Sequence, residues 1–280
     1  MTSLEFKKKC IELREQTFTL KEISQTLERS KTSVYFHIKN IPKTNVLLAK
    51  IREENLSRLN RIRPNLKGIS WKNPQCNKFQ EWTPDLVNLV AHTIFDGQIS
   101  KAGAIYYNSN SVLIENFKSK IKLIYDHNPA TYHLPNGVTR VCYFSAELRD
   151  FLLEKREELL EDILLLDKEK QKAFLISFFD DEGCVTFNRI KHRRKVRGFQ
   201  HNIKILLLVQ KLLNKFSIRS KIYKDFYEIE ISRKENLKKF AQEINFSKGV
   251  RVNGKRSNSV WKKSFEKRII LANLLASYRH

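Results

Sequence analysis

Cysteine is scarce in this chain, and its spacing excludes two common kinds of scaffold. The 280 residues include four cysteines, Cys10, Cys76, Cys142 and Cys184, and no two of them form a CxxC pair. A zinc site built from cysteine pairs and a disulfide framework are therefore not expected. Isolated cysteines are typical of proteins kept in a reducing compartment, so the sequence predicts a cytoplasmic protein.

Long uncharged apolar runs are also missing. No stretch reaches the length of about 18 residues that a membrane-spanning helix needs, so we expect no membrane partner. Charges begin within the first five residues, before any apolar stretch, and this start does not resemble a signal peptide.

Acidic residues are too few to balance the basic ones. The chain has 53 Lys and Arg against 30 Asp and Glu, which gives a formal net charge of +23. A general basic surface facing solvent is one explanation of this surplus. Nucleic acid is the better one, because a surplus of this size provides many contacts to phosphate.

Two segments share an unusual order, in which an apolar helix ends in an acid followed by a glycine. The clearer segment spans residues 173–185 and has three carboxylates, the last of them Glu182, before Gly183. The weaker one spans residues 86–97 and ends in Asp96 and a glycine. Such runs predict buried helices, which the glycine is expected to leave with a positive φ. Because a helix dipole disfavours carboxylates at this end, we expect a cation beside them.

The two halves of the chain after residue 83 predict the same order of elements. Asp96 and Glu182 are 86 positions apart (182 − 96), and Phe117 and Val209 in the next helix are 92 apart (209 − 117). The extra residues fall in a segment rich in Lys and Arg, which predicts a hairpin that reaches outward. The sequence therefore indicates a duplicated helix-strand-strand-helix-strand-strand-helix unit.

The apolar periodicity also places the single elements of these halves. Strands are expected at residues 98–100, 102–107, 131–133, 138–144, 184–189, 196–200, 221–223 and 227–231. Helices are expected from residue 83 to the first acid and at residues 111–125, 146–159, 206–216, 235–244 and 260–277.

Residues 4–40 predict a small helical unit. The second of its helices begins at Thr19, which forms a capping box with Glu22, and Ser30 is the expected N-cap of the third. This arrangement resembles a helix-turn-helix, although Glu28 stands where the turn often has a glycine. The resemblance implies that the third helix reads the major groove through Lys31, Thr32, Ser33, Tyr35 and Phe36, with His37 and Lys39 nearer the phosphates. A plain three-helix packing module is the alternative.

The composition suggests four segments. Residues 1–42 are expected to be the helix-turn-helix domain, and residues 43–82 a basic linker with one helical stretch, which either lies along phosphates or faces solvent. The first repeat is expected at residues 83–166, and the second repeat with a closing helix at residues 167–280.

At this point the chain resembles the LAGLIDADG homing endonucleases in their single-chain, two-repeat form. The second motif, LISFFDDEG at residues 175–183, is a good match, and the first, LVAHTIFDG at residues 89–97, is degenerate. The resemblance implies an α+β fold, in which the helix-turn-helix domain precedes pseudo-twofold αββαββα repeats with saddle-shaped antiparallel sheets. It also implies that Asp96 and Glu182 are catalytic and hold Mg²⁺ or another divalent cation between them.

Other residues receive roles from the same resemblance. Gln200, Lys248 and Arg251 are candidates for ordering the attacking water. Asp180 is expected to be structural and Asp181 to face solvent, while His92 is expected to be a buried histidine with its hydrogen bonds satisfied. The DNA-facing hairpin is expected to contribute Arg189, Lys191, Arg193, Arg194, Lys195 and Arg197.

These observations favour a site-specific, metal-dependent endonuclease of double-stranded DNA, acting as a monomer with internal pseudo-twofold symmetry. One alternative is a catalytically silent transcription regulator that uses the same saddle for binding. Another is an intron RNA maturase, which would bind structured RNA. In all three cases, binding should weaken steeply with salt, because phosphate contacts release counterions.

Overall fold

The structure is a computed structural model that describes residues 2–62, 76–77, 81–254 and 263–278. Two compact units make up the chain, Met1–Lys72 and Asn73–His280. None of the helices within the described residues is both long and apolar enough to span a membrane.

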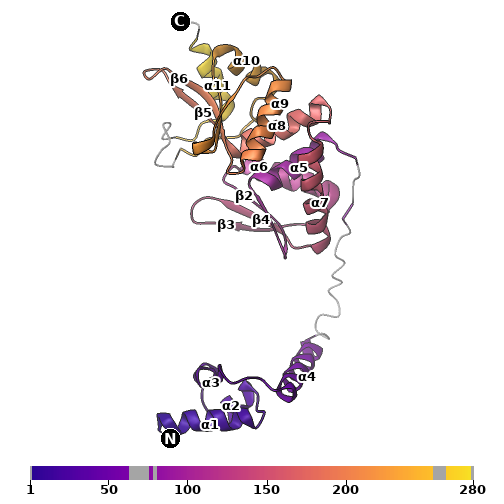
Figure 1. Ribbon diagram of the computed structural model, residues 1–280, viewed down its shortest axis with the longest axis vertical. Helices are drawn as coiled ribbons and strands as arrows, with labels where there is room; N and C mark the ends of the chain where they lie inside the picture. Colours follow the sequence, from indigo (N-terminus) through magenta and orange to yellow (C-terminus); the bar gives the residue numbers. More distant parts are fainter. Residues whose placement is uncertain (1, 63–75, 78–80, 255–262, 279–280) are drawn as a thin grey trace. The chain divides into compact units, whose positions relative to one another are not determined.

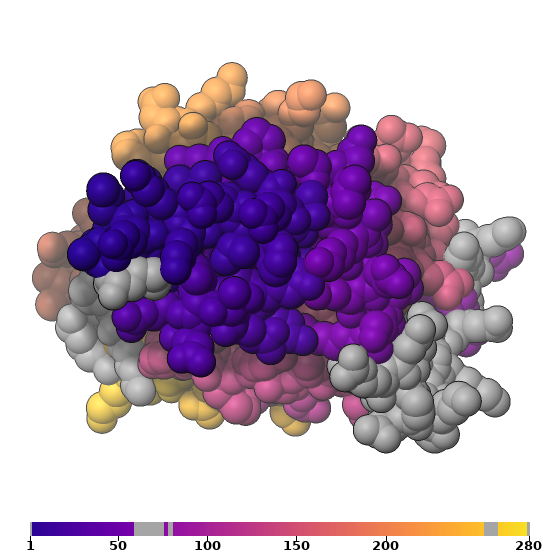
Figure 2. Space-filling view, turned by 90° about the horizontal axis from the view of Figure 1, so that it is seen from below, coloured from indigo at the N-terminus to yellow at the C-terminus, as the bar shows by residue number. Residues whose placement is uncertain are grey.

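The N-terminal unit is helical. Its described elements are α1 (Ser3–Glu15), α2 (Leu20–Thr26), α3 (Lys31–Ile38) and α4 (Asn45–Ile62). The side chains of Thr2 and Thr19 cap α1 and α2 and complete capping boxes with Glu5 and Glu22. In the space-filling view the indigo residues of these helices form one closely packed body (Figure 2). The core of this body consists of Cys10, Ile23, Val34 and Ile38.

The turn between α2 and α3 forms without a glycine. Glu28 itself adopts the left-handed conformation, with a φ of 50°, that glycine takes most easily. Helix α3 then begins at its N-cap Ser30 and exposes the side chains predicted to face outward. Among these, Tyr35 is 55% and Phe36 is 68% exposed, which is unusual for large apolar side chains. The Phe36 ring lies beside the His37 ring and the Lys39 ammonium group.

The second unit contains two sheets with their covering helices. The first half consists of α5 (Pro84–Phe95), β1 (Gly97–Ser100), β2 (Gly103–Asn108), α6 (Ser111–Ile124), β3 (Ala130–His133), β4 (Thr139–Tyr143) and α7 (Ala146–Asp162). The second half consists of α8 (Lys168–Glu182), β5 (Gly183–Asn188), β6 (Arg193–Phe199), α9 (Ile203–Lys215), β7 (Lys221–Tyr223), the 3-10 turn η2 (Lys224–Phe226), β8 (Glu228–Ile231) and α10 (Lys234–Glu243). Helix α11 (Lys267–Ala276) follows.

The strand order confirms the predicted duplication. One sheet has the order β1-β2-β4-β3 and the other has the equivalent order β5-β6-β8-β7. All of the pairs are antiparallel. The fold is therefore α+β, with N-terminal helices followed by two four-stranded antiparallel sheets (Figure 1).

Several predicted boundaries differ from the structure. Helix α9 begins at Ile203 rather than at residue 206, and α7 ends at Asp162 rather than near residue 159. Strand β6 begins at Arg193, three residues before the predicted start, because the basic residues of the hairpin pair with β5 up to Asn188. The closing helix begins at Lys267 rather than at residue 260. Residues 255–262 lie outside the described residues, and Glu266 forms an isolated bridge with Arg251 instead of a helical turn.

Helices α5 and α8 pack side by side between the two sheets (Figure 1). Helix α5 is apolar along most of its length, and α8 is apolar over residues 173–179, as the sequence predicted. Ala91 and Ser177 occupy matching positions and are fully buried, and their small side chains allow the helices to approach closely. This packing joins the two repeats into one core.

The glycines after these helices do not have the positive φ that was expected. Gly183 ends α8 with a φ of −92° and a ψ of 151°, which other residues also adopt. Its role is steric, because a Cβ atom there would lie 2.3 Å from the Phe179 carbonyl oxygen. A Cβ atom at Gly97 would similarly lie 2.5 Å from Thr93 Cα. Each glycine allows a strand to leave directly from the end of its helix.

We expect Gly183→Ala to lower the free energy of unfolding by about 2 kcal/mol or more, because the added methyl group meets backbone atoms that cannot move freely. Urea unfolding followed by circular dichroism measures this change. Gly137→Asn is the matched control, since Gly137 has open space around it and asparagine tolerates its φ of 80°. A Gly183→Ala protein as stable as the control would contradict the steric explanation.

Candidate active site and nucleic-acid interface

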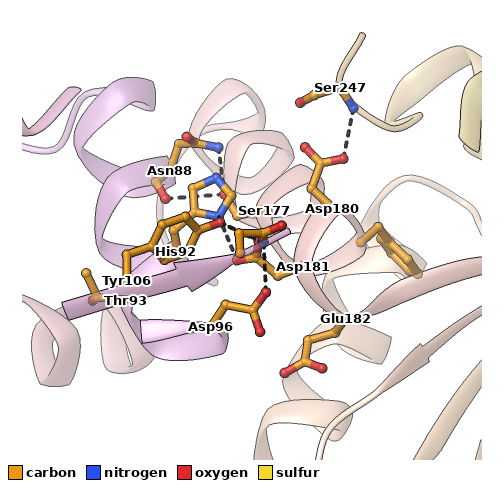
Figure 3. A network of polar contacts seen from close by, with 12 residues as sticks. Asn88, His92, Thr93, Asp96, Tyr106, Ser177, Asp180, Asp181, Glu182 and Ser247 are labelled. Atoms are coloured by element: carbon orange, nitrogen blue, oxygen red, sulfur yellow. Dashed lines mark hydrogen bonds and ion pairs between the residues drawn. The ribbon is translucent and has the colours of Figure 1, made fainter. Parts of the chain in front are cut away.

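Two acids meet where α5 and α8 end. Asp96 is the C-cap residue of α5, and Glu182 is the last residue of α8. Figure 3 shows that their carboxylates project from neighbouring helix ends towards the same space. Their negative charges interact strongly enough to affect the pKa of Glu182. The structure therefore brings together the two acids that the sequence paired.

Each acid accepts a hydrogen bond from an amide of its own repeat. Gln200 Nε2 donates to Glu182 Oε1 at 3.3 Å, and Asn108 Nδ2 donates to Asp96 Oδ2 at 2.9 Å. These amides are 92 positions apart (200 − 108), the same offset that relates the following helices. Their side-chain oxygens accept from the backbone N–H groups of Asn202 and Asn110, which fixes the orientation of each amide. Asn108 was not predicted from the sequence, although the offset from Gln200 points to it.

The surroundings of Glu182 favour its protonated form when no cation is present. Burial raises its pKa from 4.5 to about 8, and the nearby charges of Asp96 and Asp181 act in the same direction. Lys267 opposes this shift. A divalent cation bound beside buried carboxylates reduces the repulsion between their negative charges.

Asp181 is not the solvent-facing residue that was predicted. Its side chain is fully buried, and its Oδ2 atom lies 2.6 Å from Nδ1 of His92. The other oxygen accepts from the Tyr106 hydroxyl at 2.8 Å and from Asn108 Nδ2 at 3.3 Å. Asn108 also donates to Asp96, so this network connects the end of α8 to the acid of the first repeat (Figure 3). His92 is a buried histidine with a partner, as expected.

Asp180 accepts a hydrogen bond from the backbone N–H of Ser247 at 2.9 Å and is buried, which agrees with a structural role. Nearby, the fully buried ammonium group of Lys267 donates to the carbonyl oxygens of Asp180 at 2.7 Å and Phe179 at 3.2 Å. These carbonyls form the negative end of α8, where a cation is stabilising. Burial lowers the pKa of Lys267, while the surrounding carboxylates raise it. Sequence reasoning missed this residue.

The two other basic candidates lie elsewhere. Arg251 is exposed, and its guanidinium donates to the Ser264 carbonyl oxygen at 3.2 Å. Lys248 is exposed as well. Among the described residues, Lys267 is the basic residue whose charge lowers the pKa of Glu182. Neither Arg251 nor Lys248 contributes to that pKa.

Phe95 does not fill the space between the acids. Its ring packs edge-on against Phe174 and Phe178, with centroid distances of 5.5 and 5.3 Å. Both partners lie on α8 well before Glu182, because helical side chains point back towards the N-terminus. The ring of Phe95 in the degenerate first motif therefore belongs to the aromatic contact between the two helices.

The outer face of the second sheet is basic. Arg193, Lys195 and Arg197 alternate along β6, so they share one face. Lys195 pairs with Glu230, and Arg197 pairs with Glu228 at 3.1 Å. Arg193 is exposed, as are Arg189 and Lys191 in the preceding turn.

Arg194 does not belong to this outer face. It lies on the opposite face of β6, where its Nε atom donates to Ser277 Oγ at 2.8 Å. Its guanidinium lies 4.9 Å from the centre of the Tyr278 ring. The alternation of side chains along a strand separates it from its neighbours, so the predicted DNA contact of Arg194 is corrected to a structural contact.

The first sheet has a different outer face. Arg140 lies between the rings of Tyr107 and Tyr132, at 6.0 and 5.5 Å from their centres. The Tyr107 hydroxyl donates to Gln98 Oε1 at 3.1 Å. The outer face of the first sheet is therefore aromatic around a single arginine, whereas that of the second sheet is basic. This platform was not predicted, because its residues are spread over three strands.

The donor set at the helix ends fits a hard divalent cation. No group of three or more His, Cys, Asp or Glu side chains capable of enclosing a metal occurs in the described part of the chain. Mg²⁺ does not need such a group, because it keeps several waters and takes one or two carboxylates together with substrate phosphates. Asp96 and Glu182 supply two carboxylates, and burial, together with the nearby charges of Asp96 and Asp181, raises the pKa of Glu182.

Comparisons with known proteins agree with this fold. Residues 169–245 match the profile of a family described as LAGLIDADG-like domain. An uncharacterised protein of Methanocaldococcus jannaschii is 30% identical over 122 residues, which cover 37% of this chain and 41% of that protein. The chain thus spans about two fifths of the length of the curated relative that it matches.

Solved structures with a similar arrangement are more distant in sequence. One structure of variants of the homing endonuclease I-DmoI is 18% identical, with a TM-score of 0.44, and the match covers 57% of this chain and 88% of that one. Full-length DUF199/WhiA from Thermatoga maritima is 11% identical, with a TM-score of 0.46, and the match covers 71% of this chain and 63% of that one.

The profile match covers the second repeat from the start of α8 to the end of α10, and the first repeat has the same strand order. This chain therefore contains a LAGLIDADG-like domain at residues 169–245.

Proposed function

We propose that this chain is a site-specific, Mg²⁺-dependent endonuclease of double-stranded DNA. The observation that supports the proposal most directly is the meeting of Asp96 and Glu182 at the ends of two packed helices. Each acid has an amide donor at the equivalent position of its own repeat. The second repeat also has a basic outer sheet face, which provides a surface for phosphates.

Each part of the chain then has a defined task. Asp96 and Glu182 would hold the divalent cation, which would supply Lewis-acid chemistry for phosphodiester hydrolysis. Asn108 and Gln200 keep the two carboxylates oriented. In the N-terminal unit, residues 1–42 act as a helix-turn-helix domain that extends the recognised site through the exposed residues of α3. Residues 43–82 link this domain to the repeats, which span residues 83–166 and 167–280.

A second candidate is a DNA-binding regulator that does not cleave. The observation that favours it is the degenerate first motif, LVAHTIFDG at residues 89–97, which departs from the family pattern more than the second motif does. Full affinity for duplex DNA in EDTA, without cleavage in Mg²⁺, supports this candidate. Stronger binding to structured RNA than to duplex DNA supports the intron maturase instead.

Removing either acid should abolish cleavage. We expect Asp96→Asn and Glu182→Gln each to lower the cleavage of a plasmid library of randomised sites by about 100-fold or more in Mg²⁺. Binding to a site selected by the wild-type protein should change little, since neither residue lies on the outer faces. Equal cleavage by wild type and both variants, or no cleavage by wild type at any site, argues against the endonuclease.

The raised pKa of Glu182 predicts a pH-dependent stability in the absence of metal. Between its ordinary pKa of 4.5 and about 8, the folded protein keeps a proton that the unfolded chain releases. Stability therefore falls as pH rises through this window. Relative to wild type, Glu182→Gln should gain roughly 1 kcal/mol of unfolding free energy per pH unit. Urea unfolding in EDTA from pH 5 to 8 measures the difference, with the exposed Glu243→Gln as control. A constant difference over this range contradicts the assignment.

Two neighbouring arginines provide a test of the DNA-facing surface. Arg193→Gln should weaken binding and reduce the slope of log affinity against log salt by about one, because one phosphate contact is lost. Arg194→Gln removes the same charge from the opposite face and should leave the slope unchanged. Fluorescence anisotropy with duplex DNA at several salt concentrations measures both slopes. If both variants change the slope equally, the assigned faces are wrong.

A further inference from the structure

One flank of the packing between α5 and α8 is polar. Asn88 Nδ2 donates to Ser177 Oγ at 2.6 Å, and His92 Nδ1 lies 2.6 Å from Asp181 Oδ2. All four side chains are buried. They lie close together in Figure 3, where α5 supplies Asn88 and His92, and α8 supplies Ser177 and Asp181.

The other flank is apolar. Adding the repeat offset of 86 to Asn88 and His92 gives Phe174 and Phe178, and subtracting it from Ser177 and Asp181 gives Ala91 and Phe95. These equivalents are also buried. Phe95 packs edge-on against both Phe174 and Phe178. The pseudo-twofold axis therefore relates a polar cluster to an aromatic one.

Each helix thus carries two different flanks, and only unlike helices match on both sides. Two copies of α5 packed in the same way would place His92 against Phe95 on both flanks. Two copies of α8 would bury Asp181 against Phe178 twice. From this pattern, we infer that the α5–α8 surface selects the other repeat as its partner and rejects its own copy.

The physical basis is the difference between a satisfied and an unsatisfied buried carboxylate. Asp181 has His92, Tyr106 and Asn108 as donors in the observed pairing. Opposite a phenylalanine it loses the partner on the facing helix, and a buried charge without its partner is strongly destabilising. The aromatic flank adds shape complementarity without polar groups. This selection holds whether or not the chain cleaves DNA.

Single substitutions in the full chain reproduce the mismatched contacts. His92→Phe places a phenylalanine opposite Asp181, as self-pairing of α8 would, and Asp181→Phe places one opposite His92, as self-pairing of α5 would. We expect the equilibrium constant of unfolding to rise at least about tenfold in each variant. In the double variant it should be lower than in either single one, since two phenylalanines then face each other in place of the mismatched pair. Urea unfolding at neutral pH measures all four proteins.

A cross-link measures the partner choice directly. Ser177→Cys places a thiol where a second copy of α8 would bring its own residue 177. After refolding at high concentration and mild oxidation, this variant should give no more disulfide-linked dimer than the parent chain. In the His92→Phe/Asp181→Phe variant, adding Ser177→Cys should raise the yield of disulfide-linked dimer severalfold above that of the same variant with Ser177. This comparison accounts for the natural cysteines.

The outcomes separate the inference from its alternatives. Single variants that are as stable as wild type would show that the mismatched contacts are tolerated, and this would overturn it. Equal dimer yields with Ser177→Cys in both backgrounds would overturn it as well. If a single variant does not fold while the double variant does, the inference is supported, because only the matched pairing then gives a folded protein.

Discussion

The close packing of α5 against α8 is the contact on which the rest of the second unit depends. It joins the two repeats into one core. It also places the C-terminal ends of the two helices next to each other, so that Asp96 and Glu182 point towards the same region. The glycines that follow contribute by letting each sheet begin directly at its helix end. A shift of one helix turn along this packing would separate the acids by about 5.4 Å. Core packing and site geometry are therefore the same constraint in this protein.

The fold was readable from the sequence because its signals are local and occur twice. Apolar runs that end in an acid and a glycine marked α5 and α8, and the offsets of 86 and 92 residues between equivalent positions exposed the duplication. The strand order then followed from the repeat. Errors occurred where a local signal was misleading, as in β6, whose alternating basic residues pair fully with β5 although they have few apolar neighbours.

The site was readable only in part, because its surroundings come from distant segments. Asp181 was predicted to be a surface residue, since a carboxylate is rarely buried, but three donors from α5 and β2 surround it. Lys267 lies 85 residues after Glu182 (267 − 182), in a helix with no counterpart in the first repeat, so neither motif nor duplication points to it. The face of Arg194 depends on strand register, which composition does not determine.

The position of Lys267 has a consequence for how the protein is made. Translation proceeds from the N-terminus, so both motifs leave the ribosome well before residue 267 has been added. During this interval Asp96, Asp181 and Glu182 lack the buried ammonium group that the complete domain supplies. Both repeats can therefore begin to fold before the electrostatic balance at their shared helix ends is complete. Helix α11 therefore supplies a charge that neither repeat contains, in addition to its place in the packed core.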